Sequence, residues 1–418
     1  MPTIHELLRF FSSTAQLSQA EARSLVWFQF FQEVLHKGVY FFLAIIIYQS
    51  AIQFRPAFIG NLADFQVGML AVTSFFIVQR LVVFLTTIGL AQVLKEWHSD
   101  SIWIVASLTR LVVFCSLYVV NYHWGFLVLA AVAEGVHAVL FWTQFVPTVK
   151  QKKLELQPEK VFAKENSTIQ FLAELLIVLA PSLVGFFAFN YGLQMILLIG
   201  VILTLFSSFA LLDFSVQIKR EPISWLGWKK NLVSQLSWKK TLGEFGEYLN
   251  HSLFLLWPLY VYLLLKSVDR VGFLYTISLF IAILASFFIG TYLMKMQKKR
   301  HYYLSASLMS LLWLARASTL GISGIMFVDA AERLLSRLHW QLHHALKLRV
   351  ERKHHYALEM YNQVSLSLAA VVFWLLVAAI ALFTSFWPVV FIFAAVGVMV
   401  SMVIQTSNDK KIFQGFRT

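Results

Sequence analysis

Apolar runs of about 20 residues recur along the chain from Trp27 to residue 406, the length that a helix needs to cross a bilayer. The composition agrees, because 59% of the residues are hydrophobic and only 13% are charged, whereas about a quarter are charged in soluble domains. The runs do not alternate between polar and apolar residues, as the strands of a membrane barrel do. The sequence therefore predicts an all-α polytopic membrane protein.

Twelve such runs define the predicted organisation of the chain. The expected membrane spans are residues 26–50, 67–92, 102–121, 124–146, 166–189, 193–212, 245–265, 272–293, 302–320, 322–344, 360–384 and 386–406. They predict an N-terminal six-helix bundle over 26–212 and a C-terminal six-helix bundle over 245–406. Residues 1–25 are expected to be a cytoplasmic N-terminal segment and residues 407–418 a cytoplasmic tail. Residues 213–244 are expected to be a basic cytoplasmic linker that contains tryptophan.

The positive charges follow this topology. Of the lysines and arginines, 25 fall in segments on the side of the N-terminus, 3 fall on the opposite side and 6 fall within spans. Cytoplasmic loops carry the excess of basic residues, so both termini are expected in the cytoplasm of a cell with the protein in its plasma membrane. The net charge of +13 is thereby explained without nucleic acid, which is not expected as a partner.

The two predicted bundles resemble each other in sequence. Glu134 precedes Trp142 by the same spacing as Glu332 precedes Trp340, in "AEGVHAVLFW" and "AERLLSRLHW". Aligning Glu33 with Glu247 also aligns Tyr48 with Tyr262. These matches, in the same order, indicate two parallel six-helix repeats, an architecture common among secondary transporters.

The motifs between the spans resemble those of the major facilitator superfamily over residues 26–406. "GTYLMKMQKKR" keeps the family's glycine and basic positions at Gly290, Lys295, Lys298 and Lys299, although Met294 stands at the acidic position. "GLAQVLKEWH" keeps Gly89, and "LAPSLVGFF" keeps Pro181 and Gly185 of the helix-five signature, with Ala180 in place of a glycine. The resemblance implies a transporter that works by alternating access. A glycine in the loop motif would let two helices approach closely, and the lysines would gate the inner ends or bind membrane lipids.

Ionisable residues inside the predicted spans are the main functional signal. The acids are Glu33, Glu134, Glu174, Glu247, Asp329 and Glu332, and the bases are Lys37, Arg80, Arg110, Arg316, Arg333 and Arg337. Each unpaired charge at the bilayer centre costs about 2.5–3.5 kcal/mol. The charges must therefore be paired, hydrated or neutralised, and the balance of signs favours pairing across a central cavity. Arg316, near the end of its span, is expected to extend its head to the interface.

These residues give the candidate sites. The predicted substrate-binding residues are Lys37, Tyr40, Arg80, Arg110, Trp142, Trp257, Arg333 and Trp340. The predicted proton-coupling residues are Glu33, His36, Glu134, His137, Glu247, His251, Asp329 and Glu332. Histidine titrates near neutral pH, and each of the three histidines lies three or four residues from a glutamate. The expected partners are a small anionic or polar solute, protons and membrane lipids.

Other interpretations stay open for the same residues. Each charge pair could be a static contact that holds two helices together. The chain could also be a lipid-moving protein of the same fold, or a scaffold or sensor that transports nothing. No enzyme activity and no cofactor are expected, because no phosphate-binding loop is present. The protein is expected to be a monomer. No metal site is expected, because basic residues surround His339 and His343. These two histidines are expected to lie at a basic interfacial helix end.

Overall fold

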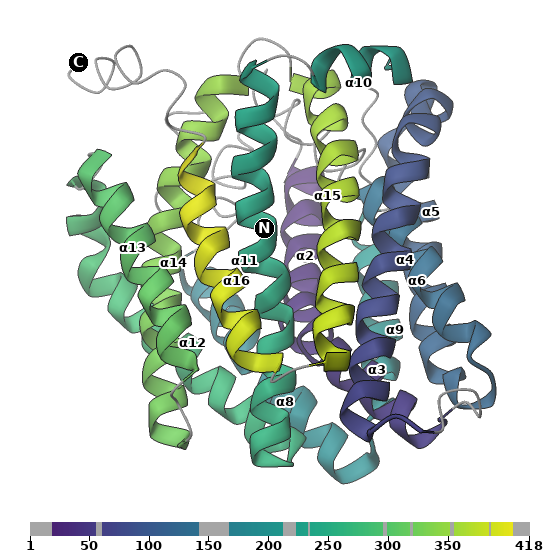
Figure 1. Ribbon diagram of the computed structural model, residues 1–418, viewed down its shortest axis with the longest axis vertical. Coiled ribbons are helices and arrows are strands. Elements are labelled where there is room, and N and C mark those ends of the chain that lie inside the picture. The colour runs from purple at the N-terminus through teal and green to yellow at the C-terminus, as the bar shows by residue number, and fades with distance from the viewer. Residues whose placement is uncertain are drawn as a thin grey trace.

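The computed structural model describes residues 19–55, 61–141, 167–211, 223–232, 235–295, 299–317, 321–351, 355–383 and 386–403. Within these ranges all regular secondary structure is helical, so the all-α prediction is confirmed. Most helices run roughly side by side along the long axis of the molecule, while α10 lies across one end of them (Figure 1).

The helices of the first half begin and end close to the predicted spans. They are α2 (Gln19–Val34), η1 (Leu35–Val39), η2 (Tyr40–Phe42), α3 (Leu43–Gln53), α4 (Asp64–Val93), η4 (Leu94–Glu96), α5 (Ser99–Tyr118), η5 (Val120–Tyr122), α6 (Gly125–Ala138), α8 (Ser167–Tyr191) and α9 (Gln194–Phe209). The first predicted span is thus not one regular helix. A π-helical turn and a 3₁₀ turn interrupt it at residues 35–42, and such interruptions often occur at functional sites.

The second half follows after a short helix. Its elements are α10 (Trp225–Leu232), α11 (Gln235–Leu265), α12 (Val268–Lys295), α13 (Lys299–Arg316), α14 (Ile322–Glu351), α15 (His355–Phe383) and α16 (Phe386–Ser401). Two of them depart furthest from the predicted boundaries. Residues 235–244, assigned to the linker, extend α11, and α14 continues to Glu351, beyond the predicted span end at 344.

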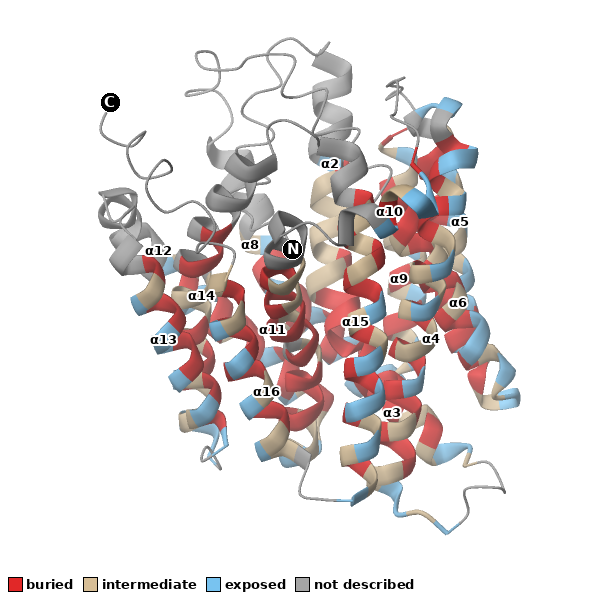
Figure 2. Cartoon of the chain, turned by 45° about the horizontal axis from the view of Figure 1, so that its top comes forward, coloured by how far each residue is buried: buried red, intermediate tan, exposed pale blue. Residues whose placement is uncertain are grey.

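Five of the described helical segments are long and apolar enough to cross a membrane: Trp27–Gln53, Asp64–Val93, Ser101–Tyr118, Thr241–Leu265 and Met360–Phe383. Four apolar helices are shorter, and α14 carries too many charges to qualify by composition. The twelve-span layout therefore stays a prediction. The outward faces are nevertheless apolar: Leu108, Phe186 and Val372 are each more than half exposed, and Figure 2 shows exposed residues on the outer faces of the bundle. Such faces suit lipid, as expected of an integral membrane protein.

Helix packing repeats between the two halves of the chain. In the first half α5 packs on α6 and α9, and α4 packs on α6. In the second half α13 packs on α14 and α16, and α12 packs on α14. In the predicted repeat α4, α5, α6 and α9 correspond to α12, α13, α14 and α16, so each pair in the first half has an equivalent pair in the second. The most extensive contacts between the halves are α4 with α15 and α8 with α12. Because α8 corresponds to α15, these two contacts are also equivalent.

The contact between α8 and α12 is made around Pro181. Pro181 has no N–H, and a proline inside a helix disturbs the backbone hydrogen bonds of the preceding turn. The Thr276 hydroxyl of α12 enters this gap: it donates to Val178 O at 3.1 Å and accepts from Ser182 N at 3.1 Å. In lipid every backbone polar group needs such a partner, so α12 completes the hydrogen bonding of α8.

Glycines allow a second close contact, between α11 and α16. A Cβ atom at Gly246 would overlap the backbone of Gly397 and Ser401, whereas one at Gly89 in α4 would meet no described atom within 4 Å. The close helix approach expected at Gly89 is thus wrong for the described part of the chain. Small residues of this kind let two membrane helices pack at short distance.

We predict that Gly246→Ala destabilises the protein by about 1–3 kcal/mol, because overpacking forces the two helix backbones apart. Gly89→Ala is the matched control. It removes a glycine from an uncrowded helix interior, and so should leave stability unchanged or raise it by up to about 1 kcal/mol. Thermal unfolding of both purified variants in detergent checks the prediction, and equal midpoints for the two would contradict it.

Candidate functional site

The first polar cluster lies inside the N-terminal half and consists of Gln32, Tyr40, Arg110, Glu134 and Ser207, here called the Arg110 cluster. The Tyr40 hydroxyl donates to Glu134 Oε2 at 2.8 Å. Arg110 Nη1 donates to Gln32 Oε1 at 2.5 Å, and Gln32 Nε2 donates to Ser207 Oγ at 3.0 Å. Five helical elements, α2, η2, α5, α6 and α9, thus contribute one side chain each.

Arg110 is 5% exposed and makes no ion pair with a described residue. Its guanidinium instead lies 5.4 Å from the Tyr40 ring centre and 5.5 Å from that of Phe141. Its Nε atom is buried without a hydrogen-bond partner. A cation in this position is stabilised by ring faces and by one neutral amide, which leaves hydrogen-bonding capacity for an anion.

Other candidate residues lie in the same half but outside the Arg110 cluster. Lys37 Nζ lies 3.5 Å from Glu33 Oε2, one helical turn away. The His36 ring stacks near Tyr40 at 5.8 Å. His137 is fully buried, and its Nδ1 contacts Ala106 O at 2.7 Å. Although His137 lies three residues from Glu134, its hydrogen-bond partner is this carbonyl, whereas the Glu134 carboxylate binds Tyr40.

The second cluster lies in the C-terminal half and is here called the Arg316 cluster: Arg316, Asp329, Glu332 and Arg333. Arg316 Nη2 lies 3.5 Å from Asp329 Oδ1 and 3.7 Å from Glu332 Oε2. Arg333 Nε lies 3.0 Å from Asp329 Oδ2. Two arginines and two carboxylates are therefore joined in one buried network, between the C-terminal end of α13 and the middle of α14.

Arg316 does not extend to the interface, so that expectation is wrong. Its side chain is 0% exposed. The guanidinium lies 4.3 Å from the ring centre of Trp257 and 3.9 Å from that of Trp313. It ends α13, where the helix dipole favours a cation, and the two carboxylates of α14 balance its charge. Trp257, predicted to bind substrate, thus packs on Arg316.

The two clusters meet across the boundary between the halves. Phe41, next to Tyr40 in η2, contacts Tyr275 of α12 with ring centres 3.9 Å apart. The Arg333 guanidinium lies 3.8 Å above the same tyrosine ring. One pair of aromatic rings therefore separates the Arg110 cluster from the Arg316 cluster.

Arg80 lies at a second point of contact between the halves. It projects from α4, and its guanidinium lies 4.5 Å from the ring centre of Tyr248 in α11. Its Nε is buried without a hydrogen-bond partner, and no ion pair with a described residue compensates its charge. The Tyr248 hydroxyl accepts from Trp374 Nε1 at 2.6 Å, so the ring beneath Arg80 is held in place.

A third cluster lies at the end of the C-terminal half that the positive charges assign to the cytoplasm, and is here called the His343 cluster: Glu247, Tyr302, His339, His343 and Ser401. His343 Nε2 lies 3.5 Å from Glu247 Oε2. The two predicted residues His251 and Trp340 pack beside it, with ring centres 5.1 Å apart. Both His339 and His343 are fully buried. Their expected place at a basic interfacial helix end stays a prediction, but their rings face other helices rather than the surface.

The family-motif residues are only partly described. Pro181 and Gly185 of α8 pack against Gly272 and Val268 of α12. Trp142 and Lys298 lie outside the described residues. Gly290, Lys295, Lys299, Glu174 and Arg337 lie in described helices, but the structure does not describe their side chains.

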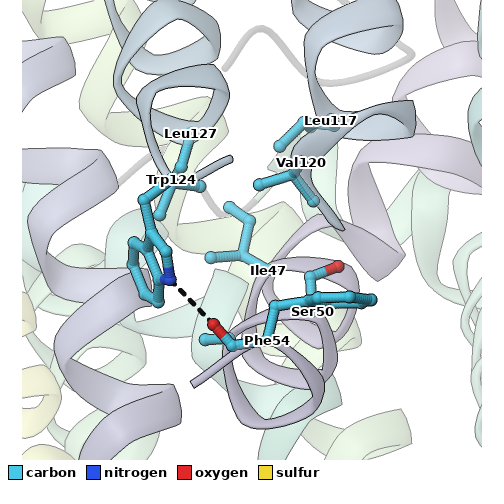
Figure 3. A pocket seen from close by; sticks show the side chains of 8 residues that line it. Ile47, Ser50, Phe54, Leu117, Val120, Trp124 and Leu127 are labelled. Atoms are coloured by element: carbon cyan, nitrogen blue, oxygen red, sulfur yellow. Dashed lines mark hydrogen bonds between the residues drawn. The ribbon is translucent and has the colours of Figure 1, made fainter. Parts of the chain in front are cut away.

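Figure 3 shows a small apolar pocket near the other end of the N-terminal half. Its lining residues are Ile47, Ser50, Ala51, Phe54, Leu117, Val120, Trp124 and Leu127. Trp124 Nε1 donates to Phe54 O at 2.8 Å and closes one side. None of the predicted site residues lines this pocket, and one serine supplies its side-chain polarity, so it does not resemble a site for a polar solute.

Several residues in or beside the clusters were not predicted from the sequence. Gln32, Tyr275, Trp313, Tyr302 and Ser207 are uncharged, and nothing in their spacing distinguishes them from ordinary residues of an apolar helix. The signal that could have found Gln32 is its position beside Glu33 in the first predicted span. Sequence alone offers none for the others.

Comparison with known proteins identifies the fold. No protein-family model matches the chain, and no curated protein matches its sequence significantly. Solved structures do match. A bacterial homologue of the iron transporter ferroportin, in an inward-facing state, gives a TM-score of 0.60 at 13% identity, covering 95% of this chain and 98% of that one.

Two further transporters match over similar lengths. The nucleoside transporter NupG gives a TM-score of 0.58 at 12% identity, with 93% of this chain and 98% of that chain covered. An auto-inhibited peptide transporter of the POT family gives 0.56 at 11% identity, with 90% and 95% covered. All three have the fold of the major facilitator superfamily, so the resemblance to that family is confirmed for the fold, of which this chain is a divergent example.

The Arg316 cluster generates a stability prediction. Arg316→Met removes the cation that lies 3.7 Å from the buried Glu332 carboxylate, and removing one partner of a buried pair costs about 3–5 kcal/mol. The additional change Glu332→Gln should recover part of that loss, since it removes the stranded charge.

Arg55→Met is the matched control. Arg55 Nη1 lies 3.4 Å from Asp64 Oδ1, nearly the distance in the buried pair, but the aspartate side chain is 70% exposed. Such exposed pairs contribute roughly 0–1 kcal/mol. Denaturant unfolding in detergent measures all three variants, and a loss for Arg55→Met as large as that for Arg316→Met would show that burial is not the cause.

Proposed function

We propose that the chain is a secondary active transporter that moves a small anionic or polar solute by alternating access, coupled to protons. The observation that carries this proposal is the pair of arginines Arg80 and Arg110. Both lie within the predicted membrane region, and neither makes an ion pair with a described residue. A charge in that position is costly unless it is compensated, and a solute that brings negative charge would compensate it.

The solute site would lie between the halves, beside Tyr40, Phe41, Tyr275 and Arg333. Arg333 already binds Asp329, so it would orient the Tyr275 ring, and Arg110 and Arg80 would supply the attraction. Guanidinium groups suit carboxylate or phosphate because several N–H donors lie in one plane. The fold supports this location, since transporters built from repeats bind their solutes near the midplane where the repeats meet.

The same proposal assigns the halves and their orientation. Residues 26–212 and 245–406 would form two six-helix bundles, joined by a cytoplasmic linker that contains α10. The repeated packing pairs support this division. Both termini would be cytoplasmic, and the lysines near Gly89 and Gly290 would bind lipid phosphates or gate the inner ends.

Glu134 would carry the coupling proton. Its carboxylate accepts a hydrogen bond from Tyr40 and lies in the field of Arg110. A bound anion would take up part of the positive field of Arg110 and so make protonation of Glu134 more favourable. Binding of solute and binding of the proton would then be linked, and each would strengthen the other.

A screen of solutes in proteoliposomes tests the function. Purified protein is reconstituted with a pH dye inside, and nucleosides, dipeptides, ferrous iron and small carboxylates or phosphates are added outside. We expect one class, an anion, to change the internal pH in a protein-dependent way. Arg110→Gln and Arg80→Gln should abolish the signal, while Arg55→Gln, outside the proposed site, should retain it. A signal that survives in both site variants would refute the arginine assignment, and no signal for any solute would favour a lipid-moving or scaffold protein.

We further predict that Glu134→Gln, which mimics the protonated carboxyl, retains exchange of solute across the membrane but loses accumulation against a gradient. Counterflow of labelled solute measures the first property and pH-driven uptake the second. Glu33→Gln is the control, because that carboxylate lies outside the Arg110 cluster, against Lys37. Undiminished pH-driven uptake by Glu134→Gln would remove this residue from the coupling mechanism.

A further inference from the structure

Helix α10 (Trp225–Leu232) lies where the two halves of the chain meet. It crosses one end of the bundle (Figure 1), the end that the positive charges assign to the cytoplasm. The end of α4 and the beginning of α15 pack against it, and these two helices share the most extensive contact between the halves. The contacts of α10 therefore bear on how this boundary opens and closes.

Helix α10 is joined to α4 by one hydrogen bond and by ring contacts. Gln92 Nε2, near the end of α4, donates to Ile223 O at 2.8 Å, two residues before α10 begins. The centre of the Phe84 ring of α4 lies 5.8 Å from that of Trp225 and 6.1 Å from that of Trp228. Gln92 is exposed and Trp225 is 39% exposed, so water can replace these contacts at low cost when they separate.

Helix α10 is joined to α15 by two hydrogen bonds and a close approach. Trp228 Nε1 donates to Ser365 Oγ at 2.9 Å, and Ser224 N donates to the Tyr361 hydroxyl at 3.3 Å. A Cβ atom at Gly227 would overlap the Tyr361 hydroxyl, so glycine allows the tyrosine to lie against α10. Trp228 is 9% exposed. Removing it from α15 would expose a large apolar ring to water and break its hydrogen bond.

The chain also ties α10 to the second half. Only residues 233–234 separate α10 from α11, whereas residues 210–224 separate it from α9. A short connection keeps the ends of two helices closer together than a long one does. Both the side-chain contacts with α15 and the connection to α11 therefore hold α10 to the C-terminal half, and the contact with α4 is the weaker attachment.

We propose that α10 is a strap that moves with the C-terminal half and closes the boundary between α4 and α15 by binding α4. Alternating access requires the halves to separate at one end while they stay together at the other. When the end that carries α10 opens, Gln92 and Phe84 release the strap, while Trp228 keeps its bond to Ser365. The role of this movement in transport rests on the proposed function, but the movement itself can be measured without a solute.

The closed strap completes a small apolar cluster. Its buried members come from α4, from α10 with the residues before it, and from α15: Ile88, Ala91, Ile223, Trp228, Met360 and Val364. Apolar side chains that pack in this way exclude water, so the closed strap seals the boundary at this end. Opening would expose Ile88 and Ala91 of α4, because Ile223 and Trp228 leave with α10.

Two pairs of spin labels distinguish movement with one half from movement with the other. One label is attached to Leu226→Cys on α10, a position that is 64% exposed, in a Cys115→Ser background because Cys115 is itself exposed. The second label is attached to Val93→Cys of α4 in one sample and to Leu368→Cys of α15 in the other, and both positions are exposed. Electron paramagnetic resonance measures the separation within each pair in full-length protein in detergent.

Gln92→Ala is the test variant, since it removes the hydrogen bond between α4 and the strap. We expect it to raise the population in which the label on α10 lies farther from Val93→Cys by roughly two- to tenfold, the usual effect of losing one hydrogen bond. The separation from Leu368→Cys should not change. Leu85→Ala is the matched control, because this residue of α4 lies beside Phe84 in the sequence but is 56% exposed, and it should change neither separation.

Phe84→Ala, which removes the ring contacts with the strap, is a second test variant and should give the same pattern as Gln92→Ala. An unchanged separation from Val93→Cys in both test variants would overturn the proposal, as would an equal lengthening in Leu85→Ala. Lengthening of the separation from Leu368→Cys would show that α10 moves with the N-terminal half and would also overturn it. Failure to find a transported solute leaves both separations measurable, so the two proposals can fail separately.

Discussion

A charge that is removed from water needs a partner, and this requirement shapes the interior of the protein. The Arg316 cluster meets it most completely. Two arginines and two carboxylates compensate one another, and two tryptophan rings enclose one of the cations. The helices that supply these groups, α11, α13 and α14, are held together where an isolated charge would be too costly. The C-terminal half therefore has an ionic core whose charges balance one another.

The N-terminal half meets the same requirement differently. Arg110 donates to an amide and lies beside ring faces, and Glu134 accepts from a phenol, while the two charges act on each other without a direct ion pair. These neutral partners stabilise a charge less than an opposite charge does, so the charges there stay available to a ligand. The interrupted helix at residues 35–42 brings Tyr40 to this place. The charges of the C-terminal half thus balance one another, whereas the N-terminal half holds charge that an incoming solute or proton can balance.

Sequence reasoning succeeded where the determining forces are local. The apolar runs predicted the helices to within a few residues in most cases, and the spacing of four between Asp329 and Arg333 indicated a shared helix face, where the two are found paired. It failed where a side chain's surroundings come from distant helices. Arg316 and Asp329 pair across a turn, Tyr40 reaches Glu134 on another helix, and His343 is buried by α13 and α16. These contacts depend on how each helix is rotated about its axis. Because the sides that face lipid and the sides that face other helices are both apolar, the sequence pattern does not reveal that rotation.

The hydroxyl of Thr276 has a mechanical consequence. It gives its only proton to Val178 O and accepts from Ser182 N, so α12 cannot slide along α8 without leaving a backbone group unsatisfied in lipid, which costs several kcal/mol. Tilting about this point keeps both bonds, and Thr276 can therefore serve as a fulcrum. Helix α12 extends about 28 Å from Thr276 to Lys295 but about 12 Å to Val268, from the rise of 1.5 Å per residue. For the same rotation, the long arm toward the basic loops would sweep more than twice as far as the short arm.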